Sequence, residues 1–178
     1  GVSYTDSVLL DRLKGYNKLF FDPEPFEGEN SIELILPFVQ VCFPDAKVLL
    51  LAIGKQTYEN SKVLGDLLYE ITKDKNSLVI ASTDMGHYLN YERAREADAY
   101  AIELISQTSP KQLHDRCYGK NYMCGLGAVV AAKIYANKKG LDRFVILNKS
   151  TSAKATGDVS KVVGYLSAAF IKNHKQNA

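Results

Sequence analysis

A short apolar run that ends in a polar loop constrains this 178-residue chain most. Residues 78–81 (Leu-Val-Ile-Ala) are bounded by turn formers, which favours a buried strand over a helix of that length. The loop that follows places Asp84 and His87 three residues apart. In open α/β sheets, functional groups collect just beyond the carboxyl ends of strands. We therefore expect an α/β protein with a candidate site at the end of this strand.

The other periodic segments extend this expectation to the whole chain. Residues 47–53 form a nearly continuous apolar run, which is typical of a strand covered on both faces in a parallel sheet. The pattern predicts one domain over residues 1–178, with a mixed, largely parallel sheet, helices on both faces and a flexible tail at 172–178. Helices are predicted near 5–13, 30–39 (N-cap Asn30, interrupted by Pro37), 57–71, 92–106, 109–117 and 128–138, and further strands at 144–147 and 161–171.

Composition excludes several classes of function. The chain has 22 basic and 20 acidic residues, and a net charge of +2 argues against a nucleic-acid or membrane binder that works by electrostatics. Three cysteines are an odd number for a disulfide framework, so we expect a reducing, cytoplasmic location. No apolar run is long enough to span a membrane, and we expect no secretory leader.

Cys124 is the third residue with candidate chemistry. It lies directly before the helix predicted at 128–138 and is followed by Gly125. A thiol at a helix N-terminus has its thiolate form favoured by the unpaired amides. A small buried cysteine in a tight turn also fits this pattern. The other cysteines, Cys42 and Cys117, are predicted to be packing residues, and both His114 and His174 are predicted to be exposed.

Asp84, His87 and Cys124 together offer one oxygen, one nitrogen and one sulfur donor. That set suits a borderline or soft transition metal better than magnesium or calcium. It equally suits Cys–His nucleophilic chemistry, in which Asp84 would orient the imidazole. Spacing alone also fits a plainer interpretation, in which Asp84 caps a turn and His87 is a hydrogen-bonded loop residue.

Four stretches, in order along the chain, resemble one family. The segment from Glu29-Asn30-Ser31 through Leu36-Pro37-Phe38 is similar to its Glu-His-Ser-Ile-Glu…Leu-Pro-Phe/Tyr stretch, and Ser82-Thr83-Asp84-Met85-Gly86-His87-Tyr88 to its Ser-Ser-Asp-Phe-x-His-Tyr/Trp motif. Cys124-Gly125 resembles the Cys-Gly turn of the family, and residues 163–168 resemble its closing strand. This is the Memo family (mediator of ErbB-driven cell motility), whose prokaryotic members are called AmmeMemoRadiSam system protein B.

The resemblance implies a fold similar to that of class III extradiol dioxygenases, with a pocket at strand ends. It implies that Cys124 is a metal ligand and that Asp84 and His87 line the same pocket, with Glu29, Asn30, Ser31 and Gly125 as neighbours. The resemblance also implies copper or iron binding and redox chemistry. It does not imply a settled reaction, so whether the chain is an enzyme stays open.

Two departures from the family pattern shape the hypotheses. The His-Ala-Gly-Tyr and Gly-Pro-x-His motifs, whose histidines supply the other metal ligands in the family, do not occur here, and Asn30 stands where the family has histidine. We therefore expect an N-terminally truncated or fragmentary Memo-like domain with an incomplete redox pocket. The alternatives are a degenerate, non-catalytic binding or assembly subunit and, lowest, a Cys–His hydrolase. A sheet that lacks strands predicts a partner: an N-terminal segment of its own, a second copy or another protein.

Overall fold

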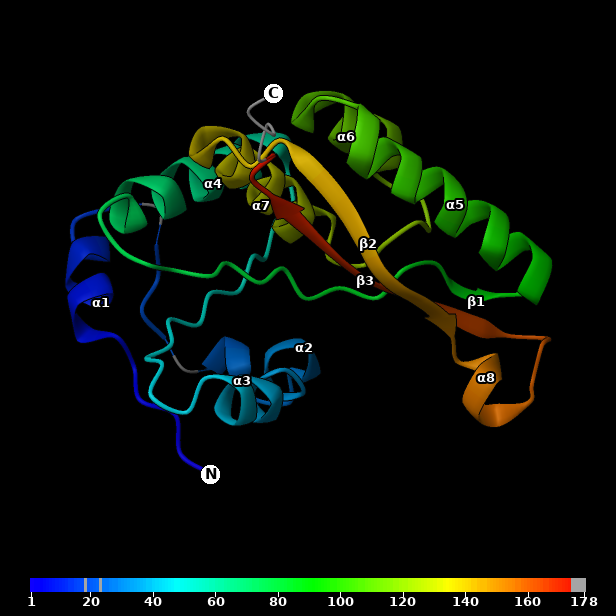
Figure 1. The fold of residues 1–178 in the computed structure, drawn as a ribbon, viewed down its shortest axis with the longest axis horizontal. Helices are drawn as coiled ribbons and strands as arrows, with labels where there is room; N and C mark the ends of the chain where they lie inside the picture. The colour runs from blue at the N-terminus through cyan, green and yellow to red at the C-terminus, as the bar shows by residue number, and fades with distance from the viewer. Residues whose placement is uncertain (18, 23, 174–178) are drawn as a thin grey trace, which may run out of the picture.

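The protein is built around a long antiparallel hairpin with helices packed against it. Its computed structural model describes residues 1–17, 19–22 and 24–173. The hairpin strands are β2 (Arg143–Thr151) and β3 (Val162–Ile171). Helices α5 (Tyr91–Gln107) and α7 (Leu126–Lys139) pack against β3, α6 (Pro110–Cys117) contacts both of them, and α4 (Tyr58–Thr72) packs against α7 (Figure 1). The remaining elements are α1 (Ser7–Leu13), the 3₁₀ turn Glu24–Phe26, α2 (Asn30–Glu33), α3 (Leu36–Cys42), β1 (His87–Leu89) and α8 (Ala153–Thr156).

The sheet is antiparallel in the order β1-β3-β2, so the expected largely parallel arrangement is wrong for this chain. Strand β2 pairs with β3 from Arg143 opposite Ile171 to Thr151 opposite Gly164, with an irregularity between Ile146 and Asn148. Ile146 and Leu147 of β2 are exposed, so the sheet is not covered on both faces. The mixed α/β class of the prediction is confirmed, and its similarity to extradiol dioxygenases stays a prediction.

The two apolar runs that anchored the prediction do not form strands in this structure. Residues 47–53 and 78–81 are irregular, and Val48 forms a parallel bridge with Thr5. An apolar sequence can prefer an extended conformation, but a strand is defined by hydrogen bonds to a neighbour. No neighbouring strand pairs with these segments within the described residues.

The helical predictions fare better, because their signals are local. Helix α6 has a capping box, in which the Ser109 hydroxyl accepts from the Gln112 amide and the Gln112 side chain accepts from the Ser109 amide. Helix α7 ends at Gly140, whose φ of 69° is the left-handed conformation that glycine adopts readily. Side chains of Thr57 and Asn90 cap α4 and α5.

The predicted helix at 30–39 is divided in two, as Pro37 indicated, but its cap differs from the prediction. Glu29, not Asn30, is the N-cap of α2, and its carboxylate accepts hydrogen bonds from the amides of Ser31 and Ile32. A glutamate can cap from this position because its longer side chain folds back over the first turn. Asn30 is the first helical residue and is exposed.

Two apolar clusters form the core. The larger one joins α5, α6 and α7 around the fully buried Leu104, Leu113 and Val130. The smaller one joins α1 to α4 through Leu13 and Ile71. Across that second contact, the Arg12 guanidinium donates two hydrogen bonds to the Asp74 carboxylate and thereby lowers the pKa of Asp74 to about 2.

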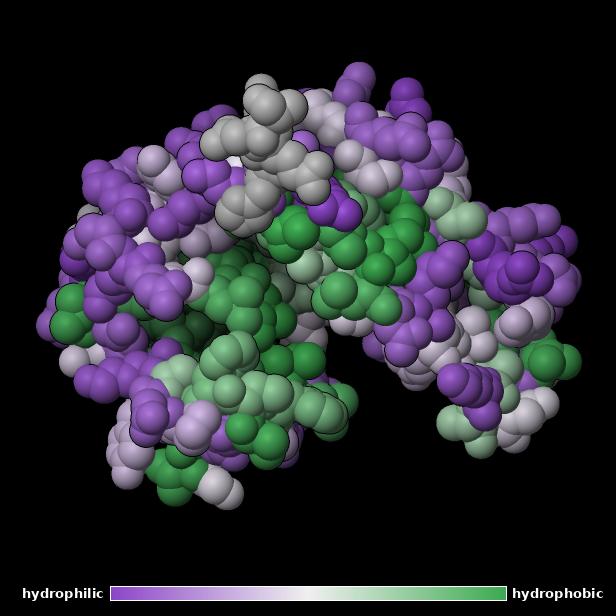
Figure 2. Space-filling view, in the orientation of Figure 1, coloured by the Kyte–Doolittle hydropathy of each residue, from purple (hydrophilic) through white to green (hydrophobic). Residues whose placement is uncertain are grey.

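The irregular segments leave apolar side chains on the surface. Leu50, Leu78 and Ile80 are each more than a third exposed. Figure 2, drawn in the orientation of Figure 1, shows hydrophobic surface gathered in the middle of the molecule, next to a hollow. Such a patch in a folded domain marks a surface that another polypeptide covers, or a ligand groove.

The chain between β2 and β3 contains the short helix α8, which ends at Gly157 with a left-handed φ of 75°. The predicted flexible tail at 172–178 falls mostly outside the described residues, which end at residue 173.

Candidate functional site

Asp84 and Cys124, which lie 40 residues apart in the sequence, are joined by two hydrogen bonds. The Cys124 amide donates to the Asp84 carbonyl oxygen over 3.2 Å, and the Asp84 amide donates to Cys124 Sγ over 3.3 Å. The next residues continue the contact, since Met85 and Met123 form an antiparallel bridge. The structure thus brings the loop after residues 78–81 against the turn before α7, and places the Cys124 sulfur against the Asp84 backbone.

Thr83 and Gln56 fix the turn that carries Cys124. The Thr83 hydroxyl accepts from the Gly125 amide over 2.7 Å and lies 3.5 Å from Cys124 Sγ. The Gln56 carboxamide accepts from the Gly127 amide and donates to the Cys124 carbonyl, at 2.7 and 2.9 Å. Gly125 is the N-cap of α7 but has no capping side chain, so Gln56 satisfies an amide of the first turn in its place. Cys124 itself is exposed at this helix N-terminus.

His87 lies at the start of β1, held by its backbone. Its amide donates to Asn121 Oδ1 over 3.1 Å, and its carbonyl accepts from Asn121 Nδ2 over 2.7 Å. The imidazole Nε2 is 3.5 Å from Asp84 Oδ2, yet it is buried and makes no hydrogen bond with any described residue. The next residue, Tyr88, has a φ of 55°, a left-handed conformation that is costly for a non-glycine residue and is frequent near functional sites.

The first Memo-like stretch reaches the same region through Ser31. Its carbonyl accepts a hydrogen bond from the Ser82 hydroxyl over 2.8 Å, directly next to Thr83. The Ser31 hydroxyl donates to Glu29 over 2.7 Å, and this bond and that from the Ser31 amide lower the pKa of Glu29. The Glu29 oxygens are therefore occupied as helix caps, and Asn30 is exposed beside them.

The donors present do not by themselves make a metal site. Over residues 1–17, 19–22 and 24–173, no three His, Cys, Asp or Glu side chains come together in a way that could hold a metal ion. Within the described residues, His87 Nε2 is buried without a hydrogen-bond partner, and the sulfur of the exposed Cys124 accepts a hydrogen bond from the Asp84 amide. No hydrogen bond joins His87 to Cys124 within the described chain, so the pair that a Cys–His hydrolase needs is not formed here.

Of the other cysteines and histidines that the sequence analysis considered, Cys42, Cys117 and His114 lie within the described residues. Cys117 is buried as predicted, and burial raises its pKa to about 11. Cys42 is exposed, so its prediction as a packing residue is wrong. His114 was predicted to be exposed but is buried between Tyr58 and Tyr118, where Nε2 lies 3.0 Å from the Gln56 carbonyl oxygen. His174 lies outside the described residues.

Sequence reasoning missed the three residues that hold the site together. Gln56, Thr83 and Asn121 act through contacts to residues 34 to 71 positions away. No local pattern marks such a residue. In the sequence, Gln56 is only the residue before a helix N-cap, and Asn121 lies in a loop rich in glycine and tyrosine. Only Thr83 stood inside a recognised motif.

Comparison with known proteins shows the family of this chain. The family model described as "Memo-like protein" matches residues 1–169. The chain belongs to the Memo family. A MEMO1 family protein of Saccharolobus solfataricus is 38% identical over 174 residues, which are 95% of this chain, and one of Saccharolobus islandicus is 35% identical over the same share. One of Caldivirga maquilingensis is 32% identical over 94% of this chain.

The match to these Memo relatives is partial on their side. The chain spans 61% of the length of each of these curated proteins. The recognition of the Memo family from four short stretches is thereby confirmed, whereas the activity of the longer proteins does not transfer with it. None of the described helices is long and apolar enough to cross a membrane.

Proposed function

We propose that this chain provides one wall of a copper- or iron-binding redox pocket of the Memo type. Cys124 would be the metal ligand, and Asp84 and His87 would line the pocket beside it. The observation that carries the proposal is the pair of hydrogen bonds between the Asp84 backbone and Cys124, which holds the loop of Asp84 and His87 against the turn of Cys124 although the two segments are distant in the sequence. The free cysteines support a cytoplasmic location as part of the same proposal.

The residues of this chain would position donor atoms for the metal but would not supply all of its ligands. Thr83 and Gln56 would keep Cys124 at the start of α7, where the unpaired amides favour negative charge on sulfur. Asn121 would hold the His87 backbone, and Nε2 of that residue makes no hydrogen bond with any described residue. Further ligands would come from polypeptide outside this chain, since its relatives are longer. A bound copper or iron ion would supply one-electron redox chemistry.

Metal analysis of the full product of the gene that encodes this chain tests the proposal. We expect copper or iron to copurify with it, and Cys124→Ala to lower metal affinity by at least about tenfold, since even outer-shell changes cost that much. Cys42→Ala is the matched control, because Cys42 is also exposed but lies on α3. Absence of metal from the unaltered protein, or equal metal content in the two variants, would overturn the proposal.

A second candidate function is that of a non-catalytic assembly subunit, which the groove around residues 47–53 and 78–81 favours. The groove has a volume of about 980 Å³ and is lined by apolar side chains from α2, α3, α4 and both irregular segments. These segments present backbone that no strand pairs with in the described structure. An exposed apolar surface with unpaired extended backbone is a surface on which a partner chain can add strands.

The assembly function predicts that partner binding depends on the groove and not on the candidate site. We expect Leu78→Lys to prevent stable association, measured by light scattering of the protein and by pull-down from cells, because it places a charge in an apolar interface. Cys124→Ala and His87→Ala should leave association unchanged. Loss of the partner in those two variants would count against this function, as would a monodisperse monomer without a partner.

A further inference from the structure

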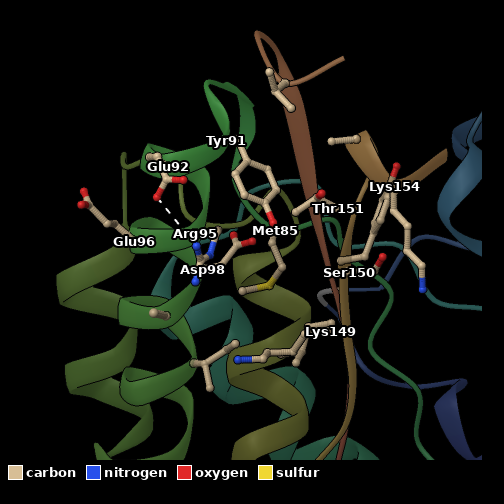
Figure 3. Close-up of a pocket in the computed structure, with 16 residues that line it drawn as sticks. Met85, Tyr91, Glu92, Arg95, Glu96, Asp98, Lys149, Ser150, Thr151 and Lys154 are labelled. Carbon is tan, nitrogen blue, oxygen red and sulfur yellow. Dashed lines mark ion pairs between the residues drawn. The ribbon is translucent and has the colours of Figure 1, made fainter. Parts of the chain in front are cut away.

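A second cleft, separate from the Cys124 turn, lies between α5 and the β2–β3 hairpin (Figure 3). Its volume is about 820 Å³, within the range of about 300–1,000 Å³ that small-molecule sites occupy. Met85 lines it from the loop that follows residues 78–81, and Ile102 and Leu166 add apolar surface from α5 and β3. The cleft thus has room and an apolar lining for a small organic molecule.

Opposite charges line the two walls of this cleft. Asp98 projects from α5, and Lys149 extends from β2 toward α5 across the cleft (Figure 3). Lys149 makes no ion pair or hydrogen bond with any described residue, and it is more than 4 Å from Asp98, beyond ion-pair distance. The two groups still interact electrostatically. Burial raises the pKa of Asp98, and the Lys149 charge lowers it by a smaller amount. A cation and an anion therefore face one another with a gap between them.

Asp98 is held in place while part of its charge stays uncompensated. Oδ1 accepts a hydrogen bond from the Gly86 amide over 3.2 Å, and the carboxylate packs against Gly164 so closely that a Cβ at this position would clash with Oδ2. Burial raises its pKa, which reflects a carboxylate short of solvent and partners. A cationic group of a ligand would supply the partner that the Asp98 carboxylate lacks.

The other charged groups of the cleft are less available. Arg95 pairs loosely with Glu92, at 3.8 Å, and lies over the Tyr91 ring. Figure 3 shows the Glu96 carboxylate directed away from Met85 and the cleft centre. The charged and titratable groups around Asp98 are Tyr91, Glu92, Arg95 and Glu96 of α5, Lys149 of β2, Lys154 of α8, Tyr165 of β3 and His87 of the adjoining β1.

We propose that this cleft binds a zwitterionic α-amino acid with an apolar side chain. Its ammonium group would pair with Asp98, its carboxylate with Lys149, and its side chain would contact Met85, Ile102 and Leu166. A zwitterion fits because it satisfies both unpaired charges at once. A simple anion would meet Asp98, and a simple cation would meet Lys149, so each would be repelled by one wall.

Three probes that share a phenyl group separate the two charges. L-phenylalanine carries both, phenethylamine lacks the carboxylate and 3-phenylpropanoate lacks the ammonium. The chain has two methionines, Met85 in the cleft and Met123 outside it, so methyl-labelled methionine gives one reporting resonance and one internal reference. We expect L-phenylalanine to shift the Met85 resonance saturably and to bind about tenfold more tightly than either partial probe.

Charge-removing substitutions complete the test. Asp98→Asn should weaken L-phenylalanine and phenethylamine about tenfold but not 3-phenylpropanoate, and it keeps an oxygen for the Gly86 amide. Lys149→Gln, on an exposed strand position, should weaken L-phenylalanine and 3-phenylpropanoate but not phenethylamine. An unchanged Met85 resonance at saturating L-phenylalanine, or variants that affect all three probes alike, would overturn the proposal.

Discussion

Replacing Gly65 with valine is expected to lower the free energy of unfolding by about 3 kcal/mol, at the upper end of typical overpacking costs. Gly65 is buried where α4 crosses α7. A Cβ at this position would lie 2.7 Å from the Ala131 carbonyl oxygen and 2.8 Å from Ile134 Cβ. Because one of these atoms is backbone, the contact cannot be relieved by rotating a side chain, and the helices must separate.

Gly54→Val is the control for this prediction. It makes the same change at a residue with no atom within 4 Å of the added Cβ, and without a left-handed φ. We expect its unfolding free energy to stay within about 0.5 kcal/mol of the unaltered protein, as for most surface substitutions. Urea unfolding followed by circular dichroism measures both variants. Equal midpoints for the two would show that α4 and α7 are not packed as closely as described.

The helices of this fold were predictable because their signals are contained in single segments. Ser109 and Pro110 mark the start of α6, and Gly140 marks the end of α7, and both boundaries are found within two residues of the prediction. Capping and termination depend on backbone groups of the same turn, so one short stretch of sequence determines them. Tertiary contacts then only need to select the face that is buried.

The strands were less predictable because a strand depends on its neighbour. Residues 47–53 and 78–81 carry the expected composition, yet no ladder forms at either segment in the described structure. The hairpin strands β2 and β3 do form, because a short connection brings them together within one region of the chain. A sequence shows the preference for an extended conformation but not whether a partner strand is present.

The sequence could name candidate residues for the site, but it could not name the residues that position them. Asp84, His87 and Cys124 were identified by residue type and by resemblance, whereas Gln56 and Asn121 carry no reactive chemistry and act across the fold. Their role is to satisfy backbone groups left open by turns. Many different residues could do this, so nothing in the local sequence singles them out.

The close approach of the two site loops makes Gly125 the most sensitive position next to Cys124. A Cβ on Gly125 would lie 2.8 Å from Thr83 Cβ and 2.9 Å from the Ser82 carbonyl oxygen. Gly125→Ala must therefore push the Cys124 turn away from residues 82–84, and we expect it to lower the unfolding free energy by about 2 kcal/mol. Gly54→Ala, in open space, should change it little.

The same substitution should also separate Cys124 from Asp84, which stability alone would not reveal. In the unaltered protein, Cys124 Sγ accepts from the Asp84 amide and lies next to the Thr83 hydroxyl. Displacing the turn breaks these contacts and frees the thiol, so iodoacetamide should modify Cys124 several-fold faster in Gly125→Ala, while Cys42 on α3 reacts at an unchanged rate. Mass spectrometry of the alkylated peptides measures both rates in one sample. If Cys124 reacts no faster although the variant is destabilised, the contact between the two loops does not control this sulfur, and the wall proposed for the redox pocket loses its structural basis.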